Sequence, residues 1–175
     1  MNEVMKALLE RRSIRSFKSE MPPREDIEQI IEAGLYAPSA RNEQAAIVVA
    51  VTNKELRDRL SRDNCRIGGW SPDVDPFYGA PVVLIAFGRK DWKNRVADAS
   101  LVMGNMLLAA HALGLGGIWI NRAKEEFDMP EYQQVLKDLG VEGEWEGVGH
   151  CCVGYIDGDM PAPAPRKPGR VFWAE

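Results

Sequence analysis

Two kinds of hydrophobic pattern follow one another along the chain. Helical spacing is clearest where Ile27, Ile30 and Ile31 form one apolar stripe after Pro22-Pro23. Short, continuous and β-branched apolar runs such as AAIVVAV and PVVLIAF are typical of strands buried on both faces. Together the patterns predict helices at residues 3–11, 24–35, 54–62, 92–113 and 128–139, a loop at 64–79, and strands at Ala45–Val51, Pro81–Phe87, Gly117–Ile120 and Val148–Ile156.

The alternation of helices and strands predicts an α/β or α+β domain with helices on both faces of its sheet. The composition, with 45% apolar and 27% charged residues among 175, is that of one globular domain rather than a disordered or fibrous chain. A net charge of −4 and the lack of an apolar run of about 20 residues give no reason to expect nucleic acid or a membrane as partner. Cys65, Cys151 and Cys152 lack the spacing of a zinc site and predict reduced thiols in a cytoplasmic protein.

Residues 160–175 differ in composition from the rest of the chain. The alternating prolines of MPAPAP require an extended backbone, and two large aromatic residues, Phe172 and Trp173, follow near the end. We therefore expect an extended arm whose aromatic side chains dock on another surface, such as that of a second subunit.

The segment Arg11-Arg12-Ser13-Ile14-Arg15 directly follows the first predicted helix. Alternate side chains of an extended segment share a face, so Arg11, Ser13 and Arg15 would point together. Two guanidinium groups and a hydroxyl match the oxygen atoms of a phosphate. The alternative is that the arginines only complement the negative end of the preceding helix.

A polar loop, PSARNEQ, joins a predicted helix to a predicted strand. Pro38 ends the helix, and Ser39, Asn42 and Gln44 supply groups that both donate and accept hydrogen bonds. Such a set suits a ligand with mixed polar edges, for example a pyrimidine-like ring. The alternative is that these side chains satisfy the backbone of their own loop.

Two further segments have candidate roles. The glycines of GLGG at residues 114–117 allow a backbone to approach a ligand closely, although Gly114 also fits the position after a helix C-terminus. Their order, helix then glycines then strand, is the reverse of a P-loop or Rossmann motif, in which the phosphate lies at a helix N-terminus. Arg166-Lys167, behind the rigid prolines, could close on an anion or simply be solvated.

The remaining reactive side chains favour packing over chemistry. His111 and His150 each lie in an apolar element, and the adjacent Cys151 and Cys152 face opposite sides of a strand. The sequence contains no metal-ligand cluster and neither a GxSxG motif nor a Ser/His/Asp set. We therefore expect no metal and no catalytic side chain.

In their order and spacing these segments resemble the nitroreductase family of FMN-dependent flavoproteins. The resemblance rests on LERRSIRSF, LYAPSARNEQ, FYGAPVVLIAF, MGNMLLAAHALGLGGIWI and PRKP, which together span nearly the whole chain. It implies an α+β fold, a three-layer α-β-α sandwich with a central, mostly antiparallel sheet, in one FMN-binding domain over residues 1–175. It also implies an intertwined homodimer with FMN at the interface and the arm 160–175 docked on the partner subunit.

The resemblance assigns the cofactor contacts residue by residue. The family motif that holds the FMN phosphate is matched by Arg11, Arg12, Ser13 and Arg15, and a late basic residue on the phosphate is matched by Arg166, with Lys167 beside it. The loop that the second subunit lends to the other side of the flavin is matched by Pro38, Ser39, Ala40, Asn42 and Gln44. The stretch along the isoalloxazine ring toward N5 is matched by Trp119, Ile120 and Asn121.

The chemistry that the resemblance implies belongs to the cofactor. FMN takes a hydride from NADH or NADPH and passes it, in a ping-pong mechanism, to a small-molecule acceptor such as a nitroaromatic or quinone. One alternative is a specialised flavoenzyme of the same fold that acts on one metabolite, as a dehalogenase, an enoate-type reductase or a flavin-fragmenting enzyme. The others are a low-turnover FMN storage or sensor dimer, and a domain with no cofactor.

Three departures from the family pattern concern the acceptor. Ala45-Ala46 replace the Pro-Trp of many members, the 64–79 loop is short, and Arg122 stands where small residues are common. The two alanines leave more room, or less stacking, near the flavin.

Overall fold

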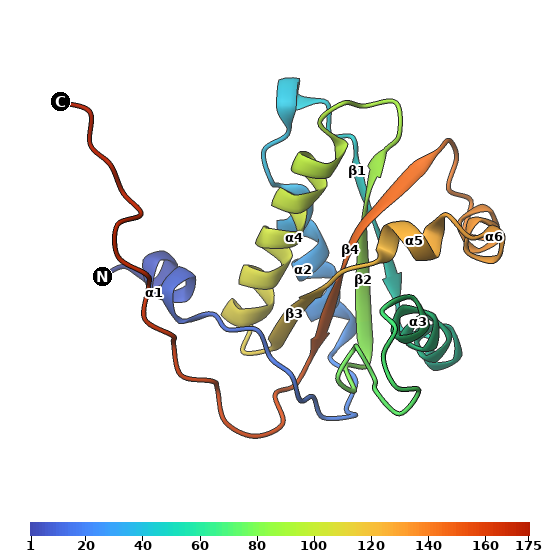
Figure 1. Cartoon of the computed structure of the whole chain (residues 1–175), viewed down its shortest axis with the longest axis horizontal. Helices are drawn as coiled ribbons and strands as arrows, with labels where there is room; N and C mark the ends of the chain where they lie inside the picture. The colour runs from blue at the N-terminus through green and yellow to red at the C-terminus, as the bar shows by residue number, and fades with distance from the viewer.

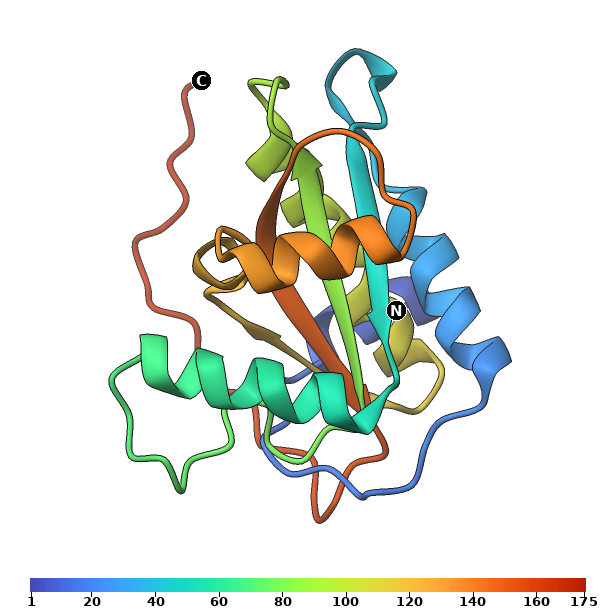
Figure 2. The ribbon, with the colours of Figure 1, turned by 90° about the vertical axis from the view of Figure 1, so that its right-hand side faces the viewer.

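The computed structural model describes residues 1–175 as an antiparallel sheet between two layers of helices (Figure 1). Helices α2 and α4 cover one face of the sheet, whereas α3, α5 and α6 cover the other, which Figure 2 shows from the front. The predicted α+β sandwich with helices on both faces is confirmed. The strands, in spatial order, are β1 (Ala46–Val51), β2 (Val82–Arg89), β4 (Trp145–Gly154) and β3 (Gly116–Ile120). The helices are α1 (Glu3–Glu10), α2 (Arg24–Leu35), η1 (Ala40–Asn42), α3 (Lys54–Ile67), α4 (Arg95–Ala112), α5 (Ala123–Phe127) and α6 (Pro130–Asp138).

The two faces of the sheet explain the continuous apolar run of β2. Successive side chains of a strand point to opposite faces. Val83 and Ile85 pack with α3, α5 and α6, while Val82 and Leu84 pack with α2 and α4. Because helices cover both faces of β2, an alternation of apolar and polar residues would bury polar side chains on one face. The whole run is therefore apolar.

Cys151 and Cys152 follow the same alternation on β4. They lie in the two different hydrophobic clusters and are both fully buried as free thiols. Burial raises the pKa of the Cys151 thiol to about 12, against a smaller opposing effect of the Arg11 guanidinium. The predicted packing role of this pair is confirmed.

The prediction that the first strand is buried on both faces is wrong. β1 hydrogen-bonds only to β2 and therefore forms one edge of the sheet. Ala50 is exposed, and Ile47 and Val48 are only partly buried. An edge strand with a free row of backbone groups is an available surface for another chain.

The polar helix predicted at 54–62 is too short. α3 extends to Ile67, because Asn64 continues the buried stripe that includes Leu60. The predicted loop 64–79 therefore starts later, after α3. The single short turn of α5 was not predicted, and β4 starts three residues before the predicted strand.

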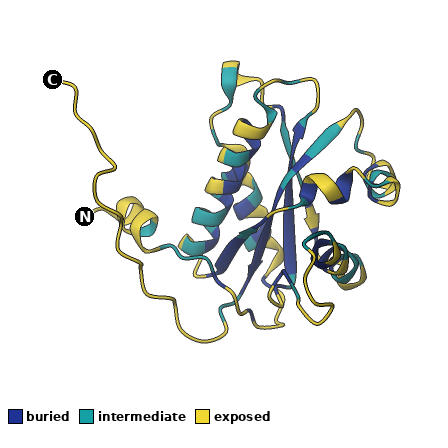
Figure 3. Cartoon of the chain, viewed as in Figure 1, coloured by how far each residue is buried: buried dark blue, intermediate teal, exposed yellow.

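The two ends of the chain contrast with this core (Figure 3). No residue of α1 is buried. Leu8 and Leu9, which belong to its apolar stripe, are each more than half exposed. Residues 160–175 form no helix or strand, and Phe172 and Trp173 are 89% and 84% exposed. None of the helices combines the length and the apolar character needed to cross a bilayer.

Candidate functional site

The segment after α1 runs beside β3. Ser13 pairs with Gly117 in a parallel bridge, and the Ile14 N–H donates to the Gly117 carbonyl at 3.2 Å. Ile14 is 2% exposed and Phe17 is 7% exposed, so their burial fixes the segment to the sheet. The structure thus brings the predicted motif at residues 11–15 next to the predicted stretch Trp119–Asn121.

The arginines of this segment have different surroundings. Arg12 donates from Nη1 to the carbonyls of Leu9 and Arg11, both at 2.7 Å, and so takes the alternative role of closing the end of α1. The Nη1 of Arg11 and the Nε of Arg12 are buried without a hydrogen-bond partner, whereas Arg15 is exposed. An unpaired buried donor costs about 1–3 kcal/mol, so these groups fit an anionic ligand that would pair with them.

The end of β3 is held by side chains from distant parts of the chain. Asn64 donates from Nδ2 to the Asn121 carbonyl at 2.8 Å, and His150 Nδ1 lies 3.2 Å from the Ile120 carbonyl. Trp119 Nε1 donates to Asn121 Oδ1 at 2.8 Å. Asn64 and His150 are fully buried, so the stretch Trp119–Asn121 is fixed before any ligand arrives.

His150 also forms a buried pair with Glu126. Its Nε2 lies 2.7 Å from Glu126 Oε2, and both side chains are 0% exposed. The ring centroid of Phe77 lies 5.2 Å from that of His150. His150 is a core residue, as expected, and its Nδ1 is paired with the Ile120 carbonyl, but Nε2 and the Glu126 carboxylate face each other without forming a hydrogen bond. The link to the Ile120 carbonyl was not predicted. The position of His150 inside an apolar strand was the only signal in the sequence for its role at β3. For Asn64, a polar residue in a polar helix, the sequence contained no signal.

The predicted polar loop at residues 38–44 lies at the N-terminal end of α4. Asp98 accepts from the Ala40 N–H at Oδ1, 3.1 Å, and from Trp92 Nε1 at Oδ2, 2.8 Å. Asp98 is only 4% exposed, so this contact anchors the loop to α4. Sequence patterns did not identify Asp98, because an acidic residue in the first turn of a helix is common for other reasons.

The loop is strained and partly satisfies itself. Arg41, Asn42 and Gln44 have φ angles of +58°, +54° and +50°, a region that costs a non-glycine residue about 1–3 kcal/mol. Ser39 Oγ accepts from the Gln44 N–H at 3.0 Å, and Gln44 Nε2 donates to Asn42 Oδ1 at 3.1 Å. The alternative role of these side chains is therefore present, while the strain marks the loop as a candidate for a second role.

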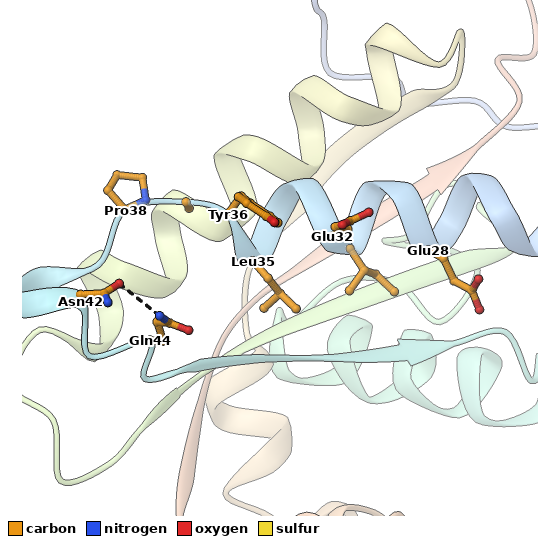
Figure 4. Close-up of a pocket in the computed structure, with 9 residues that line it drawn as sticks. Glu28, Glu32, Leu35, Tyr36, Pro38, Asn42 and Gln44 are labelled. Atoms are coloured by element: carbon orange, nitrogen blue, oxygen red, sulfur yellow. Dashed lines mark hydrogen bonds between the residues drawn. The ribbon is translucent and has the colours of Figure 1, made fainter.

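A groove of about 770 Å³ lies between this loop and α2 (Figure 4). Leu35, Tyr36 and Pro38 contribute its apolar surface, and Glu28 and Glu32 lie along α2. Asn42 and Gln44, joined by their hydrogen bond, lie at the end formed by the loop. The groove can accommodate a segment of another chain or a small molecule.

The structure does not bring all predicted site residues together. α4 has 18 residues and is therefore roughly 27 Å long. The segment 11–15 adjoins the strand that follows its C-terminal end, whereas the loop 38–44 adjoins its N-terminal end (Figure 1). Arg166 and Lys167 lie in the exposed arm, where Arg166 Nη2 donates to the Ala164 carbonyl at 3.0 Å.

Comparisons with known proteins show what the whole chain is similar to. An FMN reductase (NAD(P)H) of Bacillus subtilis is 32% identical over 170 residues, which cover 81% of this chain and 66% of that protein, slightly less than two thirds of its length. An iodotyrosine deiodinase of Thermotoga neapolitana is 26% identical, with 86% of this chain and 87% of that protein covered. A crystal structure of a nitroreductase with bound FMN from Bacteroides fragilis NCTC 9343 has a TM-score of 0.88 at 29% identity and covers 100% of both chains. The model of the nitroreductase family matches residues 8–64 and 71–155, and the chain belongs to that family.

Proposed function

We propose that the protein is an FMN-dependent oxidoreductase that transfers a hydride from NADH or NADPH to a nitroaromatic or quinone-like acceptor in a ping-pong mechanism. The observation that carries the proposal is the buried and unpaired Nη1 of Arg11, which lies on the segment paired with β3. The printed names of the relatives, FMN reductase and nitroreductase, support the same activity. FMN, when bound, supplies the redox chemistry, so the protein needs no catalytic side chain of its own.

The residues beside β3 would hold the cofactor. Arg11, Ser13 and Arg15 would bind the phosphate through charge-assisted hydrogen bonds, and Arg12 would add its free Nε. The stretch Trp119–Asn121 would lie along the flavin ring. Because Asn64 and His150 already fix this stretch, its backbone dipoles need little reorganisation when charge develops on a ligand.

A second copy of the chain would complete the site. The loop lies at the N-terminal end of α4, whereas the segment that carries Arg11 adjoins the strand after its C-terminal end. In this proposal the loop residues therefore reach the cofactor of the partner subunit; they are Pro38, Ser39, Ala40, Asn42 and Gln44. The exposed apolar stripe of α1 and the 82% exposed Tyr36 support a covered face of this kind.

The arm at residues 160–175 would dock on that second copy. Phe172 and Trp173 would be buried there, and Arg166 and Lys167 would approach the phosphate. The free edge of β1 is one surface along which an extended chain can pair. The prolines between residues 161 and 168 lack N–H groups, so only the segment after Pro168 can pair fully as a strand.

The test is the visible absorbance spectrum of the purified protein, followed by addition of NADH or NADPH without oxygen. We expect the absorbance bands of oxidised flavin and their rapid bleaching by at least one donor. The double variant Arg11→Ala/Arg15→Ala loses two charged contacts of about 1.5–3 kcal/mol each, so its FMN affinity falls by at least about 100-fold. The variant Arg62→Ala, which removes an exposed arginine of α3, should retain FMN. A wild-type protein that stays colourless after reconstitution with FMN contradicts the proposal.

A further inference from the structure

Arg122 occupies an unusual position directly after the stretch Trp119–Asn121. Its φ angle is +81°, in the left-handed region that non-glycine residues rarely adopt. Its guanidinium carbon lies 4.4 Å from the centroid of the Trp70 ring. Gly68 leaves room for this stack, because a Cβ at that position would lie 3.2 Å from Arg122 Cζ and 3.2 Å from Trp70 Cδ2.

The Arg122 guanidinium has no anionic partner within the chain. Five other arginines form ion pairs with carboxylates, whereas no carboxylate lies within 4.0 Å of Arg122. Its partner is instead an indole ring, and Trp70 is itself 44% exposed. A guanidinium stacked on an aromatic ring keeps its edge N–H groups free, and these groups match a carboxylate in a bidentate manner.

The backbone at Trp70 is anchored to the end of α3. The Trp70 N–H donates to the Cys65 carbonyl at 3.2 Å, and Cys65 Sγ donates to the Ser71 carbonyl at 3.1 Å. Both contacts tie the start of the loop to the last turns of α3, which also supplies Asn64 to the Asn121 carbonyl. One helix therefore positions both the end of β3 and the aromatic partner of Arg122.

We propose that Arg122 and Trp70 form a subsite for an anionic group on the acceptor, such as a carboxylate or sulfonate carried by a planar ring. The inference rests on the proposed function, in which Trp119–Asn121 border the flavin and the next residue borders the acceptor. Arg122 binds the anion through its free edge, and Trp70 orients the guanidinium and offers a flat apolar surface to the ring. The pair determines specificity and takes no part in hydride transfer.

The test compares two acceptors of matched shape, 4-nitrobenzoate and the neutral 4-nitrobenzamide, with the FMN-loaded enzyme. Arg122→Gln should lower kcat/KM for 4-nitrobenzoate at least about tenfold, mainly through KM, because one charge-assisted contact is lost. The same variant should change kcat/KM for 4-nitrobenzamide less than about twofold and keep its FMN content. Trp70→Phe, which retains a smaller ring, should have a kcat/KM for 4-nitrobenzoate between those of the wild type and Arg122→Gln. The control Arg62→Gln should match the wild type for both acceptors.

Equal losses of kcat/KM with the two acceptors would overturn the subsite, because Arg122 would then only support the folded structure. A loss of FMN from Arg122→Gln overturns it in favour of a cofactor contact, and an effect confined to KM for NADH or NADPH overturns it in favour of a donor phosphate. Failure of the underlying function has a different signature. In that case the wild-type protein binds no flavin or reduces neither acceptor, before any variant is compared.

Discussion

In the proposed function the end of β3 and the loop 38–44 border the cofactor from two different subunits, and the two regions are built in opposite ways. At β3, buried Asn64 and His150 hold the backbone carbonyls, and the segment carrying Arg11 is paired to the strand. The loop 38–44 contains three left-handed non-glycine residues, and its side chains are bound mainly to the loop itself. This difference fits the proposed dimer, in which each chain fixes one half of its own site and its loop 38–44 serves the site of the partner subunit.

The largest effect is expected from removing the buried Glu126 carboxylate that faces His150 near the end of β3. Glu126→Ala leaves His150 without its carboxylate partner in a fully buried site, which should lower the free energy of unfolding by about 3–5 kcal/mol. Urea denaturation followed by circular dichroism measures this loss. The matched control is Glu125→Ala on the exposed face of α5, which should stay within about 0.5 kcal/mol of the wild type. Equal stability of the two variants would mean that the pair does not hold this half.

The fold was predictable where one pattern was complete within one element. The continuous apolar run of β2 and the stripe of α2 each predicted the element and its burial. The run at β1 looked the same but lies at an edge, because local sequence does not state which strands become neighbours. The end of α3 was missed because Asn64, a polar residue, is buried by a contact with a residue 57 positions away.

The candidate site was predictable as separate segments and not as an arrangement. Segments with a distinctive composition, such as the one at residues 11–15, were found individually. Partners that act through a single atom, such as Asp98 on the Ala40 N–H, leave no pattern in the sequence. The stack of Arg122 on Trp70 was also missed, because it depends on the left-handed backbone of Arg122 and on Gly68 at the C-cap of α3.

The second effect tests the anchor of the loop half. Asp98→Asn replaces one accepting oxygen by an NH₂ group that faces a donor, either the Ala40 N–H or Trp92 Nε1. Loss of one hydrogen bond to a charged group should cost about 1.5–3 kcal/mol of unfolding free energy. Chemical denaturation measures it, with Asp138→Asn at the exposed end of α6 as the control. If both the stability and the FMN affinity are unchanged, the loop adopts its shape through the partner subunit rather than through Asp98.

The third effect separates folding from assembly. Because residues 160–175 are exposed in the single chain, their removal should leave the circular dichroism spectrum and the core stability unchanged. The same truncation should abolish the dimer and weaken FMN binding by at least about tenfold, or about 1.4 kcal/mol. Light scattering coupled to size exclusion gives the mass, and a Phe172→Ser/Trp173→Ser variant tests the aromatic contribution alone. A truncated chain that remains dimeric with unchanged FMN affinity would remove the arm from the proposed interface.

The smallest effect concerns acid stability and involves Asp75, in the loop that carries Trp70. Burial of Asp75 raises its pKa, but hydrogen bonds from Arg57, Ser61 and the Gly79 N–H outweigh this and leave the pKa below its ordinary value of 3.8. A carboxyl whose pKa is depressed in the folded state stabilises the protein above its unfolded pKa, and this stability is lost as the pH falls through the folded value.

Thermal unfolding should therefore show a decline below about pH 4 that is shallower in Asp75→Asn, which is also less stable at neutral pH. Asp73→Asn, an exposed neighbour in the same loop, should keep the slope of the wild type. Because Asp75 closes the loop that begins with Trp70, the variant should also weaken the preference for anionic acceptors if the loop holds the indole in place. Identical acid slopes in all three proteins would assign the decline to other carboxyls, such as Asp63, and would separate acid stability from the acceptor site. Burial raises the pKa of Asp63, but hydrogen bonds from Tyr132 and Arg66 outweigh this and lower it.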